Sequence, residues 1–297
     1  MMNYREFTTK VQIEVGRKLG SSYEVALNHV TKINTVQCAL TIRERTDNIA
    51  QNIYLEDFYK EYQNGRAFVS IVDNLYRLYL STSNNGMLKN LPPLTDLHTI
   101  RDRIAYKIIN TDRNLELLKD IPHKQFFNLS IVLYCVLDYT DDGIASFLIR
   151  NCHLDIWETD FNFLLNLAFE NTQKIFPLDI KGIQEAMFSI YSNDNSINNH
   201  IELLDENMFY VVTNRNKLNG FSCILYPNLL ERFSQRFGSF YILPSSLHEA
   251  LLVPVRNGIP GDLLDMVKTV NATEVPPEDF LADSVYFYNS ETNQIEM

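Results

Sequence analysis

The segment Ser245-Ser246-Leu247-His248-Glu249 holds the residues of this chain that are best suited to catalysis. An imidazole titrates near neutral pH, a carboxylate can orient it, and a serine hydroxyl can act as a nucleophile. One hypothesis is therefore a hydrolase that uses His248 as base, with Glu249, Ser245 and Ser246 beside it. The other is a structural role: on an extended strand His248 and Glu249 would point to opposite faces, and paired serines are typical of turns.

Metal and cofactor motifs are incomplete. A zinc-protease helix needs a second histidine four positions after the first, and Leu252 stands there. His123 and His153 could join His248 in a three-histidine site only if the fold united distant segments, because neither has ligand spacing from the other. Glycine-rich dinucleotide and phosphate loops are absent, and only 10 of 297 residues are glycine. We therefore predict no metal and no cofactor, and leave open whether the protein is an enzyme.

A second set of polar residues lies at or near the ends of predicted strands, where a ligand or partner could be bound. For His123 and His153 a helix cap or a loop contact is the simpler interpretation, because neither residue belongs to a complete motif. The candidate binding residues are Arg150, Asn151, His153, His123 and Asn214.

The charge balance argues against a nucleic-acid partner. The chain has 26 Lys and Arg against 37 Asp and Glu, a net charge of −11 that repels phosphate. Two short basic stretches, Arg101 to Lys107 and Arg215 to Lys217, are interrupted or outweighed by acids and predict a solvated face. A protein partner or a small ligand is the expected alternative, and the oligomeric state stays open.

A cytoplasmic location is predicted from three features. The first residues contain no apolar signal-peptide block. The longest apolar run, Ile131–Leu137, is far shorter than the ~18 residues of a membrane span. The four cysteines form no Cys-x-x-Cys pair, which favours reduced thiols.

Hydrophobic periodicity and turn residues predict an α+β fold in three parts. Residues 1–90 form a helix (3–19), a hairpin (23–27 and 36–42) and a helical stretch (55–80) broken at 64–65. Two similar mixed α/β units follow, at 94–191 and 200–297, separated by linkers at 81–90 and 192–199. Predicted strands are 103–110, 126–139, 144–149, 208–214, 240–243, 250–255 and 285–288; predicted helices are 160–171, 227–237 and 262–270.

The two later units share a pattern that suggests an internal duplication. Their helices end alike at a separation of 100 positions, and an Arg-Asn pair follows a strand in both. Coincidental reuse of one strand-then-helix order explains the same pattern, and a different strand order would argue against duplication. The matching residues are Asn171, Ile175 and Pro177 with Asn271, Val275 and Pro277, and Arg150-Asn151 with Arg256-Asn257.

Several short segments together resemble an uncharacterised bacterial family that is catalogued only as a domain of unknown function. The resemblance covers most of the chain and implies a bacterial, intracellular protein of α+β build, without supplying an activity. Its pieces are Asp102-Arg103-Ile104, Ile109-Asn110, Pro122-His123, Ile149-Arg150-Asn151, His153-Leu154, Thr213-Asn214, residues 240–249, and the tail from Asn271 to Tyr286.

The preferred functional hypothesis is a non-catalytic binding or protein-interaction module, because no catalytic signature is complete. The alternative is the hydrolase built on His248. The two hypotheses differ in what His248 does, so its surroundings in the folded protein are the first observation that bears on the choice.

Overall fold

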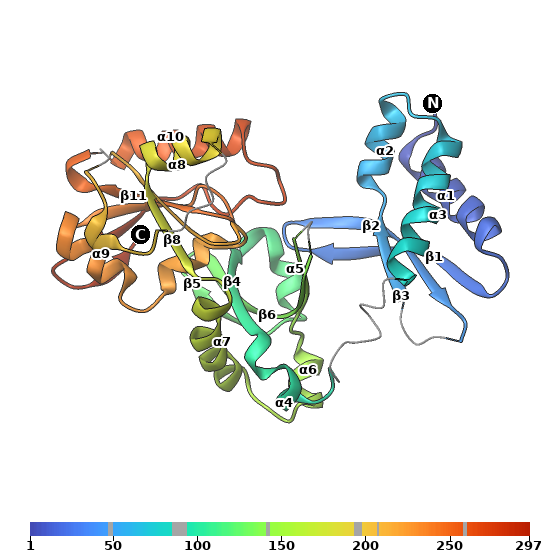
Figure 1. Cartoon of the computed structure of the whole chain (residues 1–297), viewed down its shortest axis with the longest axis horizontal. Coiled ribbons are helices and arrows are strands. Elements are labelled where there is room, and N and C mark those ends of the chain that lie inside the picture. Colours follow the sequence, from blue (N-terminus) through green and yellow to red (C-terminus); the bar gives the residue numbers. More distant parts are fainter. Residues whose placement is uncertain (47–49, 85–93, 141–142, 193–197, 207, 258–259) are drawn as a thin grey trace. The chain divides into compact units, whose positions relative to one another are not determined.

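The α+β prediction is confirmed by the computed structural model, which describes residues 1–46, 50–84, 94–140, 143–192, 198–206, 208–257 and 260–297. The chain divides into two compact units, Met1–Leu91 and Pro92–Met297 (Figure 1). Most of the predicted linker at 81–90, and residues 193–197 of the one at 192–199, lie outside the described residues.

In its described residues, the first unit combines one three-stranded antiparallel sheet with three helices. The sheet order is β1-β2-β3, and β3 is a strand that the sequence patterns did not predict. The broken helical stretch is confirmed as two helices separated near Gly65. The elements are α1 (Tyr4–Leu19), β1 (Tyr23–Lys32), β2 (Thr35–Glu44), β3 (Ala50–Tyr54), α2 (Glu56–Gln63) and α3 (Phe68–Asn84).

Local capping and an apolar stripe explain why α1 forms where predicted. Asn3 and Glu6 make a reciprocal capping box at its start, and Gly20 ends it with a φ of 86°, which a glycine adopts without strain. Phe7, Val11 and Val15 recur at four-residue spacing and are fully buried. They pack with the inward face of the sheet and with α3 into the core of the first unit.

The second unit begins with a four-stranded antiparallel sheet whose long strand β6 pairs with three others. Strand β4 is on one side of β6, and β5 and β7 are on the other. The predicted hairpin of 126–139 with 144–149 is confirmed by the β6–β7 pairing, and its turn at residues 141–142 lies outside the described residues. The elements are α4 (Leu97–Ile100), β4 (Ile104–Asn110), α5 (Leu115–Leu118), β5 (His123–Phe126), β6 (Leu129–Thr140), β7 (Gly143–Leu148), α6 (Asn151–Ile156) and α7 (Phe161–Ile175).

The prediction of one strand over 126–139 is wrong at its start. The chain turns at Phe127, whose φ is 55°, so that β5 and β6 form a hairpin. The next residue fixes the turn through tertiary contacts: Asn128 Oδ1 accepts from the Tyr286 hydroxyl at 2.6 Å, and its Nδ2 donates to Ser284 at 3.0 Å. Residues more than 150 positions away therefore stabilise a turn that the apolar sequence around it does not predict.

The outer edge of β4 is closed by side chains instead of another strand. The backbone N–H of Tyr106 donates to Thr172 Oγ1, and that of Ile108 donates to Ser222 Oγ, both at 3.0 Å. The Asn171 amide donates to the Ile104 carbonyl at 3.1 Å. These bonds satisfy polar groups that an edge strand would otherwise expose, and they join the sheet to α7 and to residues 220–225.

Lys107 is the one charged residue of β4, a strand otherwise buried along its whole length. Its ammonium lies 4.9 Å from the centre of the Tyr134 ring, and no described carboxylate is within ion-pair distance. Burial lowers the pKa of Lys107 from 10.5 to about 8. Keeping this charge in the sheet therefore costs stability.

We expect Lys107→Met to stabilise the second unit at pH 7 by roughly 2 kcal/mol. The native pKa lies below the unfolded one, so the unfolded chain holds the extra proton between about pH 8 and 10.5. Wild-type stability must rise across that window, and the advantage of the variant must shrink there. Urea unfolding followed by the fluorescence of Trp157, the single tryptophan, measures the difference at each pH. Lys124→Met, at an exposed position of β5, is the control; an equal gain there would contradict the prediction.

The second unit continues into a six-stranded antiparallel sheet of order β13-β12-β10-β11-β9-β8. Helix α10 packs against Leu243 and Val253 on one face of this sheet, and α8 covers β8 and β9 on the same face. On the other face, Phe233 of α9 packs against Tyr210 and Phe240. The elements are β8 (Leu178–Gly182), α8 (Ile183–Ser192), β9 (Tyr210–Asn214), the 3-10 segment η5 (Gly220–Leu225), α9 (Leu229–Phe237), β10 (Phe240–Leu243), β11 (Ala250–Pro254), α10 (Pro260–Thr273), β12 (Tyr286–Asn289) and β13 (Gln294–Glu296).

The internal duplication is not confirmed, because corresponding strands have different neighbours. In the four-stranded sheet β4 pairs with β6, the first strand of the β6–β7 hairpin. In the six-stranded sheet the corresponding strand is β9. It pairs with β11, the second strand of the β10–β11 hairpin, and β10 lies on the far side of β11. Similar local order therefore produces two different topologies.

Candidate functional site

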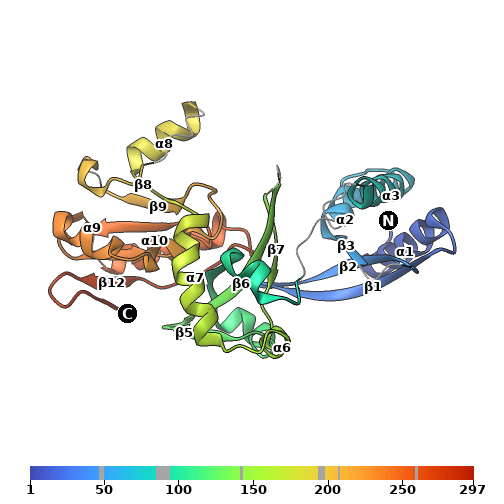
Figure 2. The same cartoon turned by 60° about the horizontal axis from the view of Figure 1, so that its bottom comes forward.

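A pocket of about 150 Å³, to which several charged residues contribute, lies on the face of the six-stranded sheet that α8 covers. Strands β8 and β9, the loop before β11 and helix α8 all contribute to it. Figure 2 shows α8 above β8 and β9. The lining residues are Asp179, Lys181, Ala186, Ser189, Val211, Thr213, Lys217, His248 and Glu249.

Strand register places the charged groups of this pocket on one face. Asp179 is paired with Thr213, and Lys181 with Val211, so all four side chains share a side of the sheet. Glu249 comes directly before β11, whose first residue, Ala250, is opposite Val212. Alternation along three neighbouring strands thus gathers residues that are 70 positions apart in sequence.

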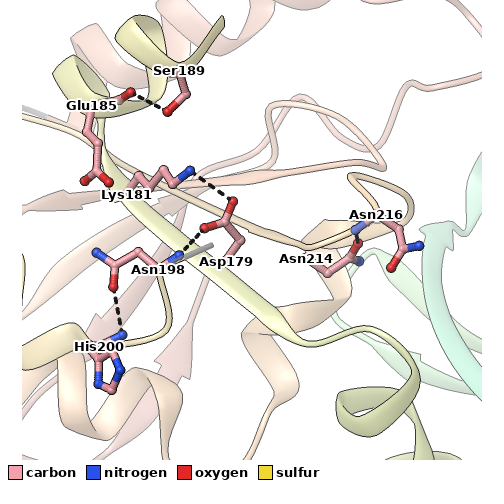
Figure 3. Close-up of polar contacts among 8 residues, drawn as sticks. All are labelled: Asp179, Lys181, Glu185, Ser189, Asn198, His200, Asn214 and Asn216. Atoms are coloured by element: carbon pink, nitrogen blue, oxygen red, sulfur yellow. Dashed lines mark hydrogen bonds and ion pairs between the residues drawn. The ribbon is translucent and has the colours of Figure 1, made fainter. Parts of the chain in front are cut away.

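A buried ion pair forms the floor of the pocket. Lys181 Nζ lies 3.7 Å from Asp179 Oδ2, and the two side chains are only 8% and 9% exposed. Figure 3 shows how the Asn198 backbone completes the site: its N–H donates to Asp179 Oδ1 at 2.8 Å. The Asn198 carbonyl in turn accepts from the backbone of Ile180 at 2.7 Å. Burying two charges is costly, so their position against a cavity points to a binding role.

Helix α8 closes the pocket with small side chains. Ala186 and Ser189 face the sheet from this helix. The Ser189 hydroxyl donates to the Glu185 carbonyl at 2.9 Å, within its own helix (Figure 3). The hydroxyl proton of Ser189 is therefore donated to the backbone and not to the imidazole of His248.

His248 is held by hydrogen bonds at both ring nitrogens. Its Nε2 is 3.0 Å from Asp279 Oδ1, and its Nδ1 accepts from the backbone N–H of Asn219 at 3.2 Å. Because a backbone N–H can only donate, Nδ1 is unprotonated and Nε2 carries the proton toward the carboxylate. The ring therefore joins three loops and has no free nitrogen in this arrangement.

The hydroxyls near His248 do not contact its ring. The segment 244–249 is a loop, and not the extended strand that would separate His248 from Glu249. Ser245 Oγ donates to Glu249 Oε1 at 3.1 Å, and Ser246 Oγ accepts from the His248 backbone at 3.0 Å. Thr213 Oγ1 donates to the His248 carbonyl at 2.8 Å. Of the four residues predicted for catalysis, His248 and Glu249 line the pocket.

Three of the five predicted binding residues lie close together after the four-stranded sheet, away from the pocket lining. Arg150 pairs with Asp120 at 3.0 Å, and Asn151 donates to the Lys119 carbonyl. His153 Nδ1 accepts from the Arg150 backbone at the start of α6, and its ring stacks on Trp157. Burial, reinforced by the Arg150 charge, lowers the pKa of His153.

The remaining two predicted residues also have local partners. His123 is exposed on β5, with Nδ1 3.0 Å from the Ile121 carbonyl. Asn214 shapes the turn after β9, where its Oδ1 accepts from the Asn216 N–H at 3.1 Å (Figure 3). Its Nδ2 donates to the Leu218 carbonyl. Because Asn214 directly follows Thr213, it belongs to the scaffold of the pocket. The three histidines are distributed over separate surroundings.

Sequence patterns missed Asp179 and Lys181, the most buried charges of the site. A signal was present: Leu178–Gly182 alternates charged with apolar or small residues directly after Pro177. Such alternation usually indicates a half-exposed strand. Here α8 covers the polar face as well, which only the tertiary structure shows.

The described part of the chain holds neither a metal-binding cluster nor a membrane-spanning helix. No group of three or more His, Cys, Asp or Glu side chains is arranged to bind a metal ion within it. None of its helices has the length and apolarity needed to cross a lipid bilayer.

The fold and the site define an α+β protein with two units, the second of which carries a charged pocket on its larger sheet. The chain belongs to a family of unknown function, DUF5688, whose model matches residues 4–290. Neither the curated proteins nor the solved structures contain a match to the chain.

Proposed function

We propose that this protein is a binding protein whose second unit takes a small zwitterionic molecule, such as an amino acid, in the pocket. The observation that carries the proposal is the buried Asp179–Lys181 pair facing a cavity. A ligand with both an ammonium and a carboxylate can satisfy both charges at once. The size of the pocket, about 150 Å³, suits a molecule of this kind and excludes a folded protein segment.

The mouth of the pocket repeats the two charges of its floor. Glu249 and Lys217 lie there with His248, and Glu249 already accepts one hydrogen bond from Ser245. Lys217 is exposed and is held in a left-handed backbone conformation, with a φ of 53°. The buried pair and the more exposed pair each combine a carboxylate with an ammonium. Both pairs therefore match a ligand that carries one positive and one negative group.

The hydrolase hypothesis has one observation in its favour, the pairing of His248 with Asp279. A carboxylate that orients an imidazole is a recurring part of general-base catalysis. The geometry supports binding better, because the Asn219 N–H occupies the second ring nitrogen, and Ser245 and Ser246 make their hydrogen bonds to Glu249 and to the His248 backbone instead of to the ring. In the binding proposal His248 serves as a positioning residue for the loop that carries Glu249.

The binding proposal is tested by titrating the full-length protein with the twenty amino acids and β-alanine. Thermal unfolding is followed by Trp157 fluorescence, with acetate and methylammonium as monofunctional controls. We expect at least one zwitterion to stabilise the second unit by about 2.7 kcal/mol at 100 times its Kd. Lys181→Met should abolish this ligand-induced shift, and Lys174→Met, at an exposed lysine of α7, should retain it. The proposal is wrong if no zwitterion exceeds the monofunctional controls, or if Lys181→Met retains the shift.

We also propose that the protein works in the bacterial cytoplasm. The four cysteines are all free, and Cys38, Cys135 and Cys223 are buried where no disulfide partner lies. Burial raises the pKa of Cys135 and Cys223 to about 12, which keeps both as neutral thiols. Buried, unpaired thiols are typical of proteins in reducing compartments.

A further inference from the structure

An open groove of about 600 Å³ lies where three parts of the second unit meet: the β5–β6 turn, the start of α9 and the β12–β13 hairpin. Its floor is apolar and buried, and two half-buried phenylalanines form part of one wall. The floor residues are Ile224, Tyr226, Leu229, Leu230 and Tyr288, and the wall residues are Phe126 and Phe127.

The rim of the groove is polar and consists mainly of amides. Five exposed side chains stand there: Gln125, Asn228, Glu231, Asn293 and Gln294. Four of the five are amides, each of which both donates and accepts hydrogen bonds. Alcohol groups have the same dual capacity.

No lysine, arginine or histidine is among the described residues that line the groove, and Glu231 is its one charged residue. A groove without a cation offers no charge-assisted hydrogen bond to a phosphate, a sulfate or a carboxylate. Anionic ligands, including nucleic acids and acidic peptides, are therefore disfavoured.

We propose that this groove binds a short, neutral oligosaccharide. Sugar rings present apolar C–H faces, which fit the aromatic and aliphatic floor, and hydroxyls, which fit the amide rim. The open groove, about 600 Å³ in volume and lined by two hairpins, has room for more than one sugar ring. This site is separate from the charged pocket, shares no lining residue with it and does not depend on the ligand proposed there.

Hydrogen bonds pre-organise the groove. Gln125 Nε2 donates to the Phe127 carbonyl at 2.9 Å, and the Tyr288 hydroxyl donates to Asn293 Oδ1 at 3.2 Å. The Tyr226 hydroxyl donates to the Phe176 carbonyl at 2.6 Å, which fixes that ring in the floor. A wall that is already ordered loses little conformational entropy when a ligand binds.

The test is isothermal titration of the full-length protein with maltohexaose, cellohexaose, xylohexaose and chitohexaose. We expect at least one hexasaccharide to bind with a Kd between about 10 µM and 1 mM. Phe126→Ala removes part of the wall and Gln294→Ala removes a rim amide, and each should weaken that binding at least tenfold. Phe163→Ala, at a 47%-exposed phenylalanine of α7, is the matched control and should bind as the wild type does.

Three results would overturn the proposal. The first is that none of the four hexasaccharides binds. The second is equal affinity in the wild type, Phe126→Ala and Gln294→Ala, which would place the sugar elsewhere. The third is tighter binding of a sulfated hexasaccharide or of an extended peptide library, because either would assign the groove to another class of ligand. Far-UV circular dichroism and Trp157 fluorescence confirm that each variant is folded.

Discussion

Gly220→Ala is expected to destabilise the second unit by about 3 kcal/mol. A Cβ at this position would come closer than 3.0 Å to the His248 carbonyl oxygen, to Thr213 Oγ1 and to the Thr213 Cα. Two of these are backbone atoms, so a side-chain rotation cannot relieve the clash. The same Thr213 hydroxyl donates to the His248 carbonyl, so this contact helps to fix the loop beside the pocket.

The effect should spread beyond the site of substitution, because Gly220 begins η5. Ser222 of that segment closes the edge of β4, and Cys223 contacts the Thr213 carbonyl. Moving η5 would therefore disturb both sheets of the second unit. The midpoint of urea unfolding, followed by Trp157 fluorescence, measures the loss.

Gly261→Ala is the control for this prediction. A Cβ at Gly261 meets no atom within 4 Å, and alanine in a helix is more stable than glycine by roughly 0.5–1 kcal/mol. We expect this variant to be as stable as the wild type or slightly more so. If Gly220→Ala proved equally stable, the close packing of η5 against the His248 loop would be refuted.

The second large effect is expected at the floor of the pocket. Asp179→Asn removes a negative charge and keeps an oxygen that can accept from the Asn198 N–H. The Lys181 ammonium then stays buried without its neighbouring carboxylate, and we expect a loss of about 3 kcal/mol. The double variant Asp179→Asn/Lys181→Met should recover most of it, because no charge remains to be desolvated.

A double-mutant cycle separates this pair from its surroundings. The coupling energy between Asp179 and Lys181 should reach about 1–3 kcal/mol. Glu116→Gln breaks a surface pair with Lys119, in which the side chains are 79% and 69% exposed, and should cost no more than about 0.5 kcal/mol. A coupling near zero for the buried pair would show that each charge is stabilised independently of the other.

Much of the secondary structure follows from local pattern. Phe7, Val11 and Val15 predict α1, and the hairpin of β1 with β2 contains the two strands predicted at 23–27 and 36–42. Strand β10 begins and ends at its predicted residues. These elements have a single apolar face of clear period, so neighbouring residues contain enough information to define them.

The elements that local pattern missed are short or depend on distant partners. Strand β3 has five residues, only one of them fully buried, and no apolar alternation marks it. The turn after β5 is stabilised by Tyr286 and Ser284. Strand β8 carries two charged residues that become buried because α8 covers them. Residues far away in sequence determine the outcome in each case.

The candidate site also combines a motif that the local sequence shows with contacts that depend on distant residues. The motif around His248 was visible in sequence, but its partner Asp279 lies 31 residues away and the Asn219 N–H 29 residues away in the other direction. These partners decide which ring nitrogen carries the proton. The hydrogen bonds that hold the ring therefore could not be derived from the motif alone.

By itself, the sequence determined an α+β protein of ordinary composition, the positions of most helices and strands, and the lack of complete catalytic signatures. These properties depend on composition and on apolar period, which are local. Only the tertiary structure decided which strands are neighbours, and with it the absence of a shared topology between the two sheets. It also decided that Asp179, Lys181 and Glu249 face one cavity, because cross-strand register joins residues whose distance in sequence carries no information about their distance in space.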